Sequence, residues 1–234
     1  MGTTPTAAHT RENAGLTAGR EKQLLIWMAG HLPAAVHSDH LSALGLVSMG
    51  AAGLAFAAFP LTSWAAAGVV VALVLNWAGD SLDGTVARVR QQQRPRYGFY
   101  VDHVIDLAGT TLLLGGLAVS GLMQPLLAAL VLAAYLLVSS ESYLATHAVG
   151  VFRMSFLGFG PTELRLLLMA GAVRAAVSPW VSPFGLGHVR LFDLGGTVAA
   201  CALSVVFVVS SVRNTRWLYR AEPMPGKAGT RRAA

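Results

Sequence analysis

Six long apolar segments dominate this 234-residue chain and limit what it can fold into. A helix needs about 20 apolar residues to cross a membrane, and only the fifth segment is a little short. Only 12% of the residues are charged, against about 25% in a soluble domain. We therefore predict an all-α polytopic integral membrane protein with six transmembrane helices, at about 41–59, 63–86, 99–120, 124–146, 161–178 and 191–213.

Polar regions flank the membrane domain, which we place at 41–213. Residues 1–20 are polar and are expected to be loose. Residues 21–36 mix charged residues with Leu and Trp. This mixture predicts an amphipathic helix lying at the membrane interface, and the alternative is a plain lead-in to the first span. Residues 214–234 form a basic tail.

Basic residues are unevenly distributed along the chain. Fifteen of the 17 Lys and Arg residues lie in the two terminal regions, in the second loop, or in and beside the fourth loop. The positive-inside rule places these segments in the cytoplasm. We therefore predict a multi-pass protein of the cell membrane with both termini cytoplasmic. This topology accounts for the net charge of +6 without a nucleic-acid partner, and the single cysteine, Cys201, excludes a disulfide scaffold.

Four of the 11 carboxylates lie close together where the second span ends and the third begins. Asp80 and Asp83 are three residues apart, and Asp102 and Asp106 are four apart. Each spacing puts its pair on one helix face, and the short connection makes the two helices antiparallel neighbours. We therefore expect all four side chains to meet near the cytoplasmic side of the membrane. The alternative is that they cap helices or pair with the arginines between Arg88 and Arg96.

Carboxylates that converge in a low dielectric need protonation or bound cations. Oxygen ligands favour Mg²⁺, Mn²⁺ or Ca²⁺, and four carboxylates are enough for two such ions. A two-ion carboxylate site commonly serves phosphoryl transfer.

Several neighbours of the aspartates have the sizes and charges expected of an anion-binding site. Gly84, Ala87 and Gly98 let a ligand approach the backbone, although ordinary helix packing favours the same small residues. Arg88 is suited to a phosphate, or it is one of the topology charges. Asn76, one turn before the first aspartate, reaches the same ligand or makes an interhelical hydrogen bond.

These residues carry a resemblance to a known family. The run from Asp80 to Arg88 reads D-x-x-D-G-x-x-A-R, and after nine residues the run from Gly98 to Asp106 reads G-x-x-x-D-x-x-x-D. All eight fixed positions resemble the signature of the CDP-alcohol phosphotransferase family, also called CDP-alcohol phosphatidyltransferases. The six-span layout is similar to that family as well.

The resemblance implies an enzyme of phospholipid synthesis in the lipid bilayer, usually a homodimer. Such an enzyme passes a phospho-group from a CDP-linked donor to an alcohol and releases CMP, using two ions of Mg²⁺ or Mn²⁺. By resemblance, Asp80, Asp83 and Asp102 are metal ligands, and Asp106 lies near the ions and is the general base. The CDP site is implied to include Gly84, Ala87, Arg88 and Gly98.

Other residues bear on the alcohol acceptor. The pair Asp102-His103 and the run from Gly160 to Glu163 resemble the choline and ethanolamine phosphotransferase branch, which implies catalytic roles for His103 and Glu163. The alternative for Glu163 is a favourable charge in the first turn of a helix. Glu141, inside the fourth span, is expected in the acceptor pocket or in a structural pair. Arg153 is expected to meet an anionic acceptor or to be a topology charge.

Two directions of transfer remain open from the sequence. CDP-diacylglycerol gives its phosphatidyl group to a polar alcohol, or a CDP-linked aminoalcohol gives its phospho-head to diacylglycerol. Two rival functions are a cation-coupled transporter or channel, and a catalytically inactive family member. Transporters often contain internal repeats, and this chain has none. Release of CMP that depends on Mg²⁺ or Mn²⁺ separates the enzyme from both rivals.

Overall fold

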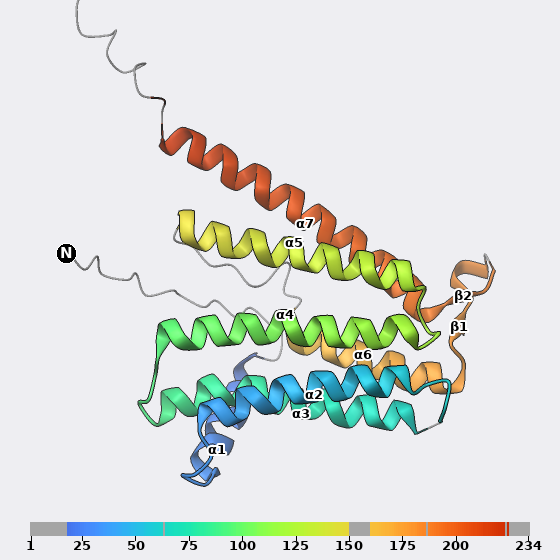
Figure 1. The fold of residues 1–234 in the computed structure, drawn as a ribbon, viewed down its shortest axis with the longest axis horizontal. Helices are drawn as coiled ribbons and strands as arrows, with labels where there is room; N and C mark the ends of the chain where they lie inside the picture. Colours follow the sequence, from blue (N-terminus) through green and yellow to red (C-terminus); the bar gives the residue numbers. More distant parts are fainter. Residues whose placement is uncertain (1–17, 63, 150–159, 186, 223, 225–234) are drawn as a thin grey trace, which may run out of the picture.

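Seven helices make up almost all of the computed structural model, which describes residues 18–62, 64–149, 160–185, 187–222 and 224 (Figure 1). A short antiparallel hairpin pairs β1 (Trp180–Val181) with β2 (Val189–Arg190), and a 3-10 turn, η1 (Pro183–Gly185), lies between them. The predicted all-α class is confirmed. The helices are α1 (Ala18–His31), α2 (Ser38–Ala57), α3 (Ala65–Val89), α4 (Pro95–Val119), α5 (Pro125–Val149), α6 (Pro161–Val177) and α7 (Leu191–Ala221).

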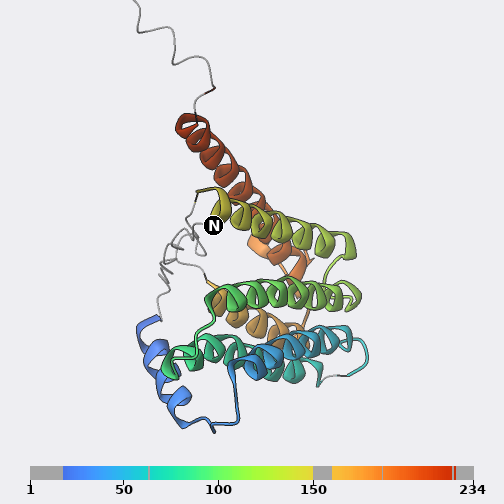
Figure 2. The same cartoon turned by 60° about the vertical axis from the view of Figure 1, so that its left-hand side comes forward.

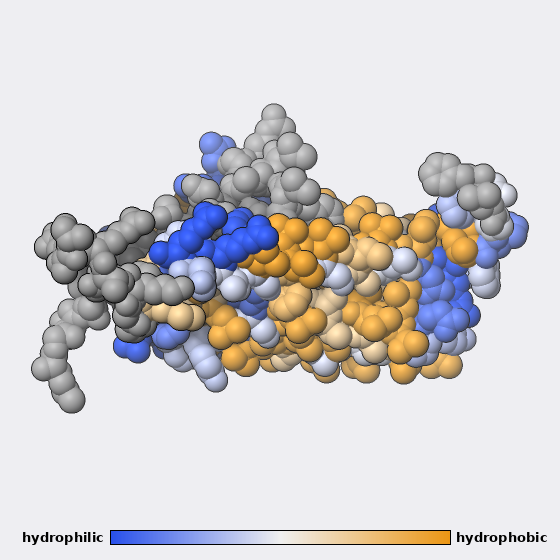
Figure 3. Space-filling model, turned by 90° about the horizontal axis from the view of Figure 1, so that it is seen from above, coloured by the Kyte–Doolittle hydropathy of each residue, from blue (hydrophilic) through white to orange (hydrophobic). Residues whose placement is uncertain are grey.

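Five of the described helices, α2, α3, α4, α5 and α7, are long and apolar enough to cross a membrane. Apolar side chains cover the middle of the face in Figure 3, and hydrophilic residues lie towards both ends. The remaining predicted span is α6, whose 17 residues extend about 26 Å, against a hydrocarbon core of about 30 Å. The sixth span therefore stays a prediction.

Helix boundaries differ from the predicted ones mainly at α4 and α7. α4 begins at Pro95, because proline has no N–H to lose in a first turn and its φ is already helical. α7 continues to Ala221, so the first residues of the segment 214–234 are helical, while residues 225–234 lie outside the described part. Arg213, Arg216 and Arg220 extend this helix, since arginine is a good helix former.

α2 is the central helix of the bundle and packs against both α3 and α4. Close approach is possible because glycines face each other across both contacts. A Cβ added to Gly79 of α3 would lie 2.7 Å from the backbone nitrogen of Gly45 in α2, and Gly116 of α4 faces Gly53 of α2. The largest fully buried side chains of the core are Phe56, Leu73, Leu117, Val69 and Val86.

The outer helices join this core in pairs that are not always neighbours in sequence. α6 packs on α3, and α5 packs on both α4 and α7 (Figure 2). α1 packs across α3, where Leu25 and Ala29 are buried with Leu82 and Val86. A helix at about the predicted position is therefore present, while its placement at a membrane interface stays a prediction.

Helices α2 to α7 alternate in direction, so that the α3–α4 turn, α1 and the end of α7 lie at one end of the bundle (Figure 1). The hairpin of β1 and β2 lies at the other end. We call the first of these the carboxylate end, because the aspartates at the end of α3 and the start of α4 lie there.

Candidate metal and phosphate site

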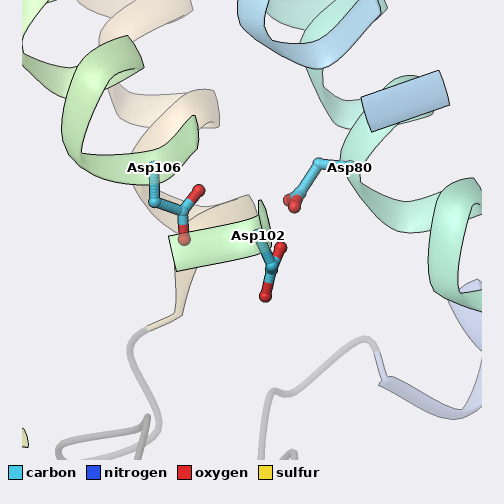
Figure 4. A group of neighbouring side chains, drawn as sticks. All are labelled: Asp80, Asp102 and Asp106. Atoms are coloured by element: carbon cyan, nitrogen blue, oxygen red, sulfur yellow. The ribbon is translucent and has the colours of Figure 1, made fainter. Parts of the chain in front are cut away.

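Three of the four predicted aspartates converge at the carboxylate end. Asp80 of α3 and Asp102 and Asp106 of α4 each offer a carboxylate oxygen, and these oxygens lie within 4.8 Å of one another (Figure 4). All three residues are half-buried. We call this group the carboxylate cluster. The four-residue spacing in α4 stacks two of these carboxylates on one helix face. The predicted side-by-side packing of α3 and α4 is wrong, because each of them packs mainly on α2, and it is their carboxylates that meet.

The fourth aspartate, Asp83, is directed towards α2. Its Oδ2 accepts a hydrogen bond from Ser42 Oγ at 2.7 Å, and its backbone oxygen accepts one from Ser38 Oγ at 2.9 Å. Its Oδ1 also contacts the N–H of Gly84. Residues three apart on a helix are rotated by about 60°, so Asp80 faces α4 while Asp83 faces α2. The structure therefore brings together three of the four predicted carboxylates.

An arginine from α6 enters the site beside Asp80. The guanidinium of Arg165 donates from Nη2 to Asp80 Oδ2 at 2.5 Å and from Nε to Asn76 Oδ1 at 2.7 Å. Asn76 in turn donates from Nδ2 to the backbone oxygen of Gly45 at 2.9 Å. This interhelical hydrogen bond is one of the two roles expected of Asn76 from the sequence.

From the sequence, Arg165 is expected only to be a topology charge beside the fourth loop. The missed signal was an ionisable residue inside an apolar segment, which usually has a specific partner.

His103 lies on the side of α4 that faces α5. Its ring is buried between Phe99 and Tyr143, at centroid distances of 4.1 and 4.8 Å. With Nδ1 protonated it donates to the backbone oxygen of Phe99 at 2.6 Å, and the same nitrogen is 3.9 Å from Asp102 Oδ2. The histidine therefore lies directly beside one member of the carboxylate cluster.

The residues expected to receive CDP lie on the last turns of α3 and the first turn of α4. Arg88 is exposed, and its Nη2 donates to Thr85 Oγ1 at 3.0 Å. A Cβ on Gly84 would lie 3.2 Å from Arg88 Nη1, whereas a Cβ on Gly98 would meet no heavy atom of the described residues within 4 Å. Ala87 is half-buried. Among the described residues, the Cβ position of Gly98 is therefore unobstructed, as is required where a ligand approaches the backbone.

Two further predicted site residues, Glu163 and Glu141, make contacts of their own. Glu163 accepts a hydrogen bond from the N–H of Gly160 at 3.0 Å, so it caps the start of α6. Glu141 of α5 accepts from Ser210 Oγ and from Asn214 Nδ2 of α7, both at 2.7 Å. These contacts match the structural alternative for each carboxylate. Arg153 lies outside the described residues.

The donor set of the carboxylate cluster suits a hard divalent cation. Three carboxylate oxygens from α3 and α4 are within the separation that a shared ion bridges, and all-oxygen ligands favour Mg²⁺, Mn²⁺ or Ca²⁺ over zinc. The three side chains are half-buried rather than fully buried, so an ion held there would be within reach of a ligand. The residues present therefore fit a metal site of the kind that assists phosphoryl transfer.

Comparison with known proteins identifies one family. The family model described as CDP-alcohol phosphatidyltransferase matches residues 38–209, from the start of α2 into α7. The matched segment contains the carboxylate cluster, Asp83 and Arg165, whereas α1 lies outside it. No curated protein shows significant similarity to the chain.

Proposed function

Because the chain belongs to the CDP-alcohol phosphatidyltransferase family, we propose that it transfers a phosphatidyl or phospho-alcohol group from a CDP-linked donor to an alcohol hydroxyl and releases CMP. Enzymes of this family are transferases of phospholipid synthesis in membranes. The observation that carries the proposal is the carboxylate cluster within the matched segment. Such a cluster suits a reaction that moves a phosphoryl group between oxygens, since negative charge accumulates on the diphosphate.

In this proposal the site holds two ions of Mg²⁺ or Mn²⁺. Asp80, Asp102 and Asp106 are the first candidates for ligands, and Asp83 supplies a fourth carboxylate from the next turn of α3. When bound, the ions neutralise the diphosphate and stabilise the leaving CMP. Gly84, Ala87, Arg88 and Gly98 form the side of the site that receives the CDP group, and the guanidinium of Arg88 is suited to a phosphate.

The transfer step can be written as a single displacement. The acceptor hydroxyl oxygen bonds to the phosphorus that carries the lipid or the alcohol, and the bond from that phosphorus to the bridging oxygen breaks. CMP leaves with the bridging oxygen, and the hydroxyl proton passes to a carboxylate, which we propose is Asp106. His103, 3.9 Å from Asp102, is the residue best placed to assist the acceptor from the α5 side.

Only a few residues bear on the identity of the acceptor and on the direction of transfer. His103 and Glu163 favour a CDP-linked aminoalcohol as donor and diacylglycerol as acceptor, whereas CDP-diacylglycerol with a polar alcohol is the other direction. The hydrogen bonds of Glu141 to α7 favour a structural role for this residue over one in an acceptor pocket. We further propose six spans including α6, α1 at the interface, a cytoplasmic site, and a homodimer.

The test is CMP release by purified protein in lipid, with Mn²⁺ or Mg²⁺. One arm supplies CDP-diacylglycerol with a panel of polar alcohols, and the other supplies CDP-choline or CDP-ethanolamine with diacylglycerol. We expect metal-dependent CMP release in one arm, at least 100-fold lower in Asp106→Asn because a positioned base typically contributes that much. The matched control is Asp193→Asn at the opposite end of the bundle, whose carboxylate accepts from the N–H of Gln124 at 2.7 Å. Equal CMP release by Asp106→Asn and the parent protein would contradict the assignment.

A further inference from the structure

Arg165 is a basic side chain from α6 that is hydrogen-bonded to a member of the carboxylate cluster. It donates to Asp80 Oδ2 at 2.5 Å and to Asn76 Oδ1 at 2.7 Å, and its side chain is only 12% exposed. A guanidinium stays protonated at all physiological pH values and binds through a planar fork. Arg165 therefore places a permanent positive charge on the carboxylate that is also a candidate metal ligand.

The position of Arg165 is set by contacts at two levels of α6. Asn76, which accepts from Arg165, is itself bonded to the backbone of Gly45 in α2. One turn before the arginine, Thr162 donates to Glu21 of α1 at 3.3 Å, and Glu21 also accepts from the indole of Trp77 in α3 at 2.8 Å. α6 is thus joined to α3 both directly and through α1, so the guanidinium is held in place rather than moving freely.

A divalent cation in the carboxylate cluster would share a carboxylate with the guanidinium of Arg165. The cluster consists of Asp80, Asp102 and Asp106, and Arg165 is bonded to the first of these. The guanidinium and such an ion also draw on the same carboxylate, Asp80, and they repel each other across it.

We propose that Arg165 is a positioning residue that orients Asp80 and weakens the binding of divalent cations to the carboxylate cluster. It holds Asp80 with Asn76 as a second support, and its positive charge lowers the affinity of the cluster for a divalent cation. This inference deepens the proposed function, because it takes the carboxylate cluster as the metal site.

The test measures Mn²⁺ binding directly, without any nucleotide or turnover. The full chain in nanodiscs is titrated with Mn²⁺, and free Mn²⁺ is followed by its electron paramagnetic resonance signal. We expect Arg165→Gln to bind Mn²⁺ about tenfold more tightly, the effect expected for one and two charges about 6 Å apart under nearly full water screening. Arg165→Lys keeps the charge and is expected to stay within about twofold of the parent protein.

Arg174→Gln is the matched control. Arg174 lies on the same helix at its other end, where it donates to the backbone oxygen of Ser178 at 2.6 Å. The Arg174→Gln variant loses the same charge far from the carboxylate cluster, so its affinity for Mn²⁺ should equal that of the parent protein. If Arg165→Gln is not monodisperse in size-exclusion chromatography, Arg165→Met removes the same charge with an apolar side chain and replaces it.

The outcomes separate this inference from the function on which it rests. Mn²⁺ binding by the parent protein with unchanged or weaker binding by the neutral variant overturns the role of Arg165 and leaves the metal site standing. Equal tightening in Arg165→Lys and Arg165→Gln overturns the role of the charge. An absence of Mn²⁺ binding in the parent protein overturns the metal site and this inference together.

Discussion

Two adjacent glycines in α4, Gly115 and Gly116, offer a sharp test of how this bundle is packed. A Cβ on Gly116 would lie 2.5 Å from the Cα of Gly53 in α2 and closer still to the carbonyl carbon and oxygen of that residue. A Cβ on Gly115 would meet no heavy atom within 4 Å in the described part of the chain. The same substitution at neighbouring positions therefore distinguishes the contact between helices from the effect of alanine on the helix itself.

The expected magnitude follows from this geometry. Ordinary van der Waals contact begins at 3.4 Å, and the closest contact, to the carbonyl oxygen of Gly53, is 1.9 Å. The two helices must therefore separate by about 1.5 Å to accept Gly116→Ala, and overpacking of this kind typically costs about 1–3 kcal/mol. The opposing atoms are backbone rather than the end of a flexible side chain, so the cost should fall in the upper half of that range. Gly115→Ala should be neutral or stabilising by up to about 1 kcal/mol, because alanine restricts the unfolded chain.

The assay is thermal unfolding of each purified variant in the same detergent, followed by the loss of the monodisperse peak. We expect a clear fall in the unfolding temperature for Gly116→Ala and none for Gly115→Ala. Equal unfolding temperatures for the two variants would show that α2 and α4 do not meet at Gly53, and the packing described above would be wrong.

Three further substitutions test the polar contacts between helices. Glu21→Ala leaves the indole N–H of Trp77 in α3 without its acceptor, so we expect the free energy of unfolding to fall by about 1–3 kcal/mol. Lys22→Ala, at the exposed neighbouring position, should change it by less than about 0.5 kcal/mol. Thermal unfolding compares the two variants. Glu141→Ala removes two hydrogen bonds to α7, and limited proteolysis should detect release of that helix before the rest of the bundle unfolds. Arg94→Gln breaks the exposed ion pair with Asp39 and should leave the unfolding temperature unchanged, since such pairs are solvent-screened; a clear decrease would contradict this.

Hydropathy and the spacing of the aspartates predict much of this molecule. Apolar runs locate the long helices because a membrane leaves few other ways to satisfy the backbone. The four-residue spacing of Asp102 and Asp106 leads directly to their shared face beside Asp80. The same reasoning misses the direction of Asp83, because a rotation of about 60° decides between α4 and α2 and the spacing says nothing of where those helices lie.

The partners of the buried polar groups depend on which helices are neighbours, and that order is not written in any local pattern. Glu141 meets α7 and Arg165 meets α3, in each case a helix that is not adjacent in sequence. An ionisable residue inside an apolar segment indicates that a partner or cavity exists, because its desolvation is costly. It does not indicate which helix supplies that partner. Backbone contacts at glycines such as Gly53 and Gly79 set how closely α2 packs on α4 and on α3, so the arrangement of the candidate site depends in part on packing that lies outside it.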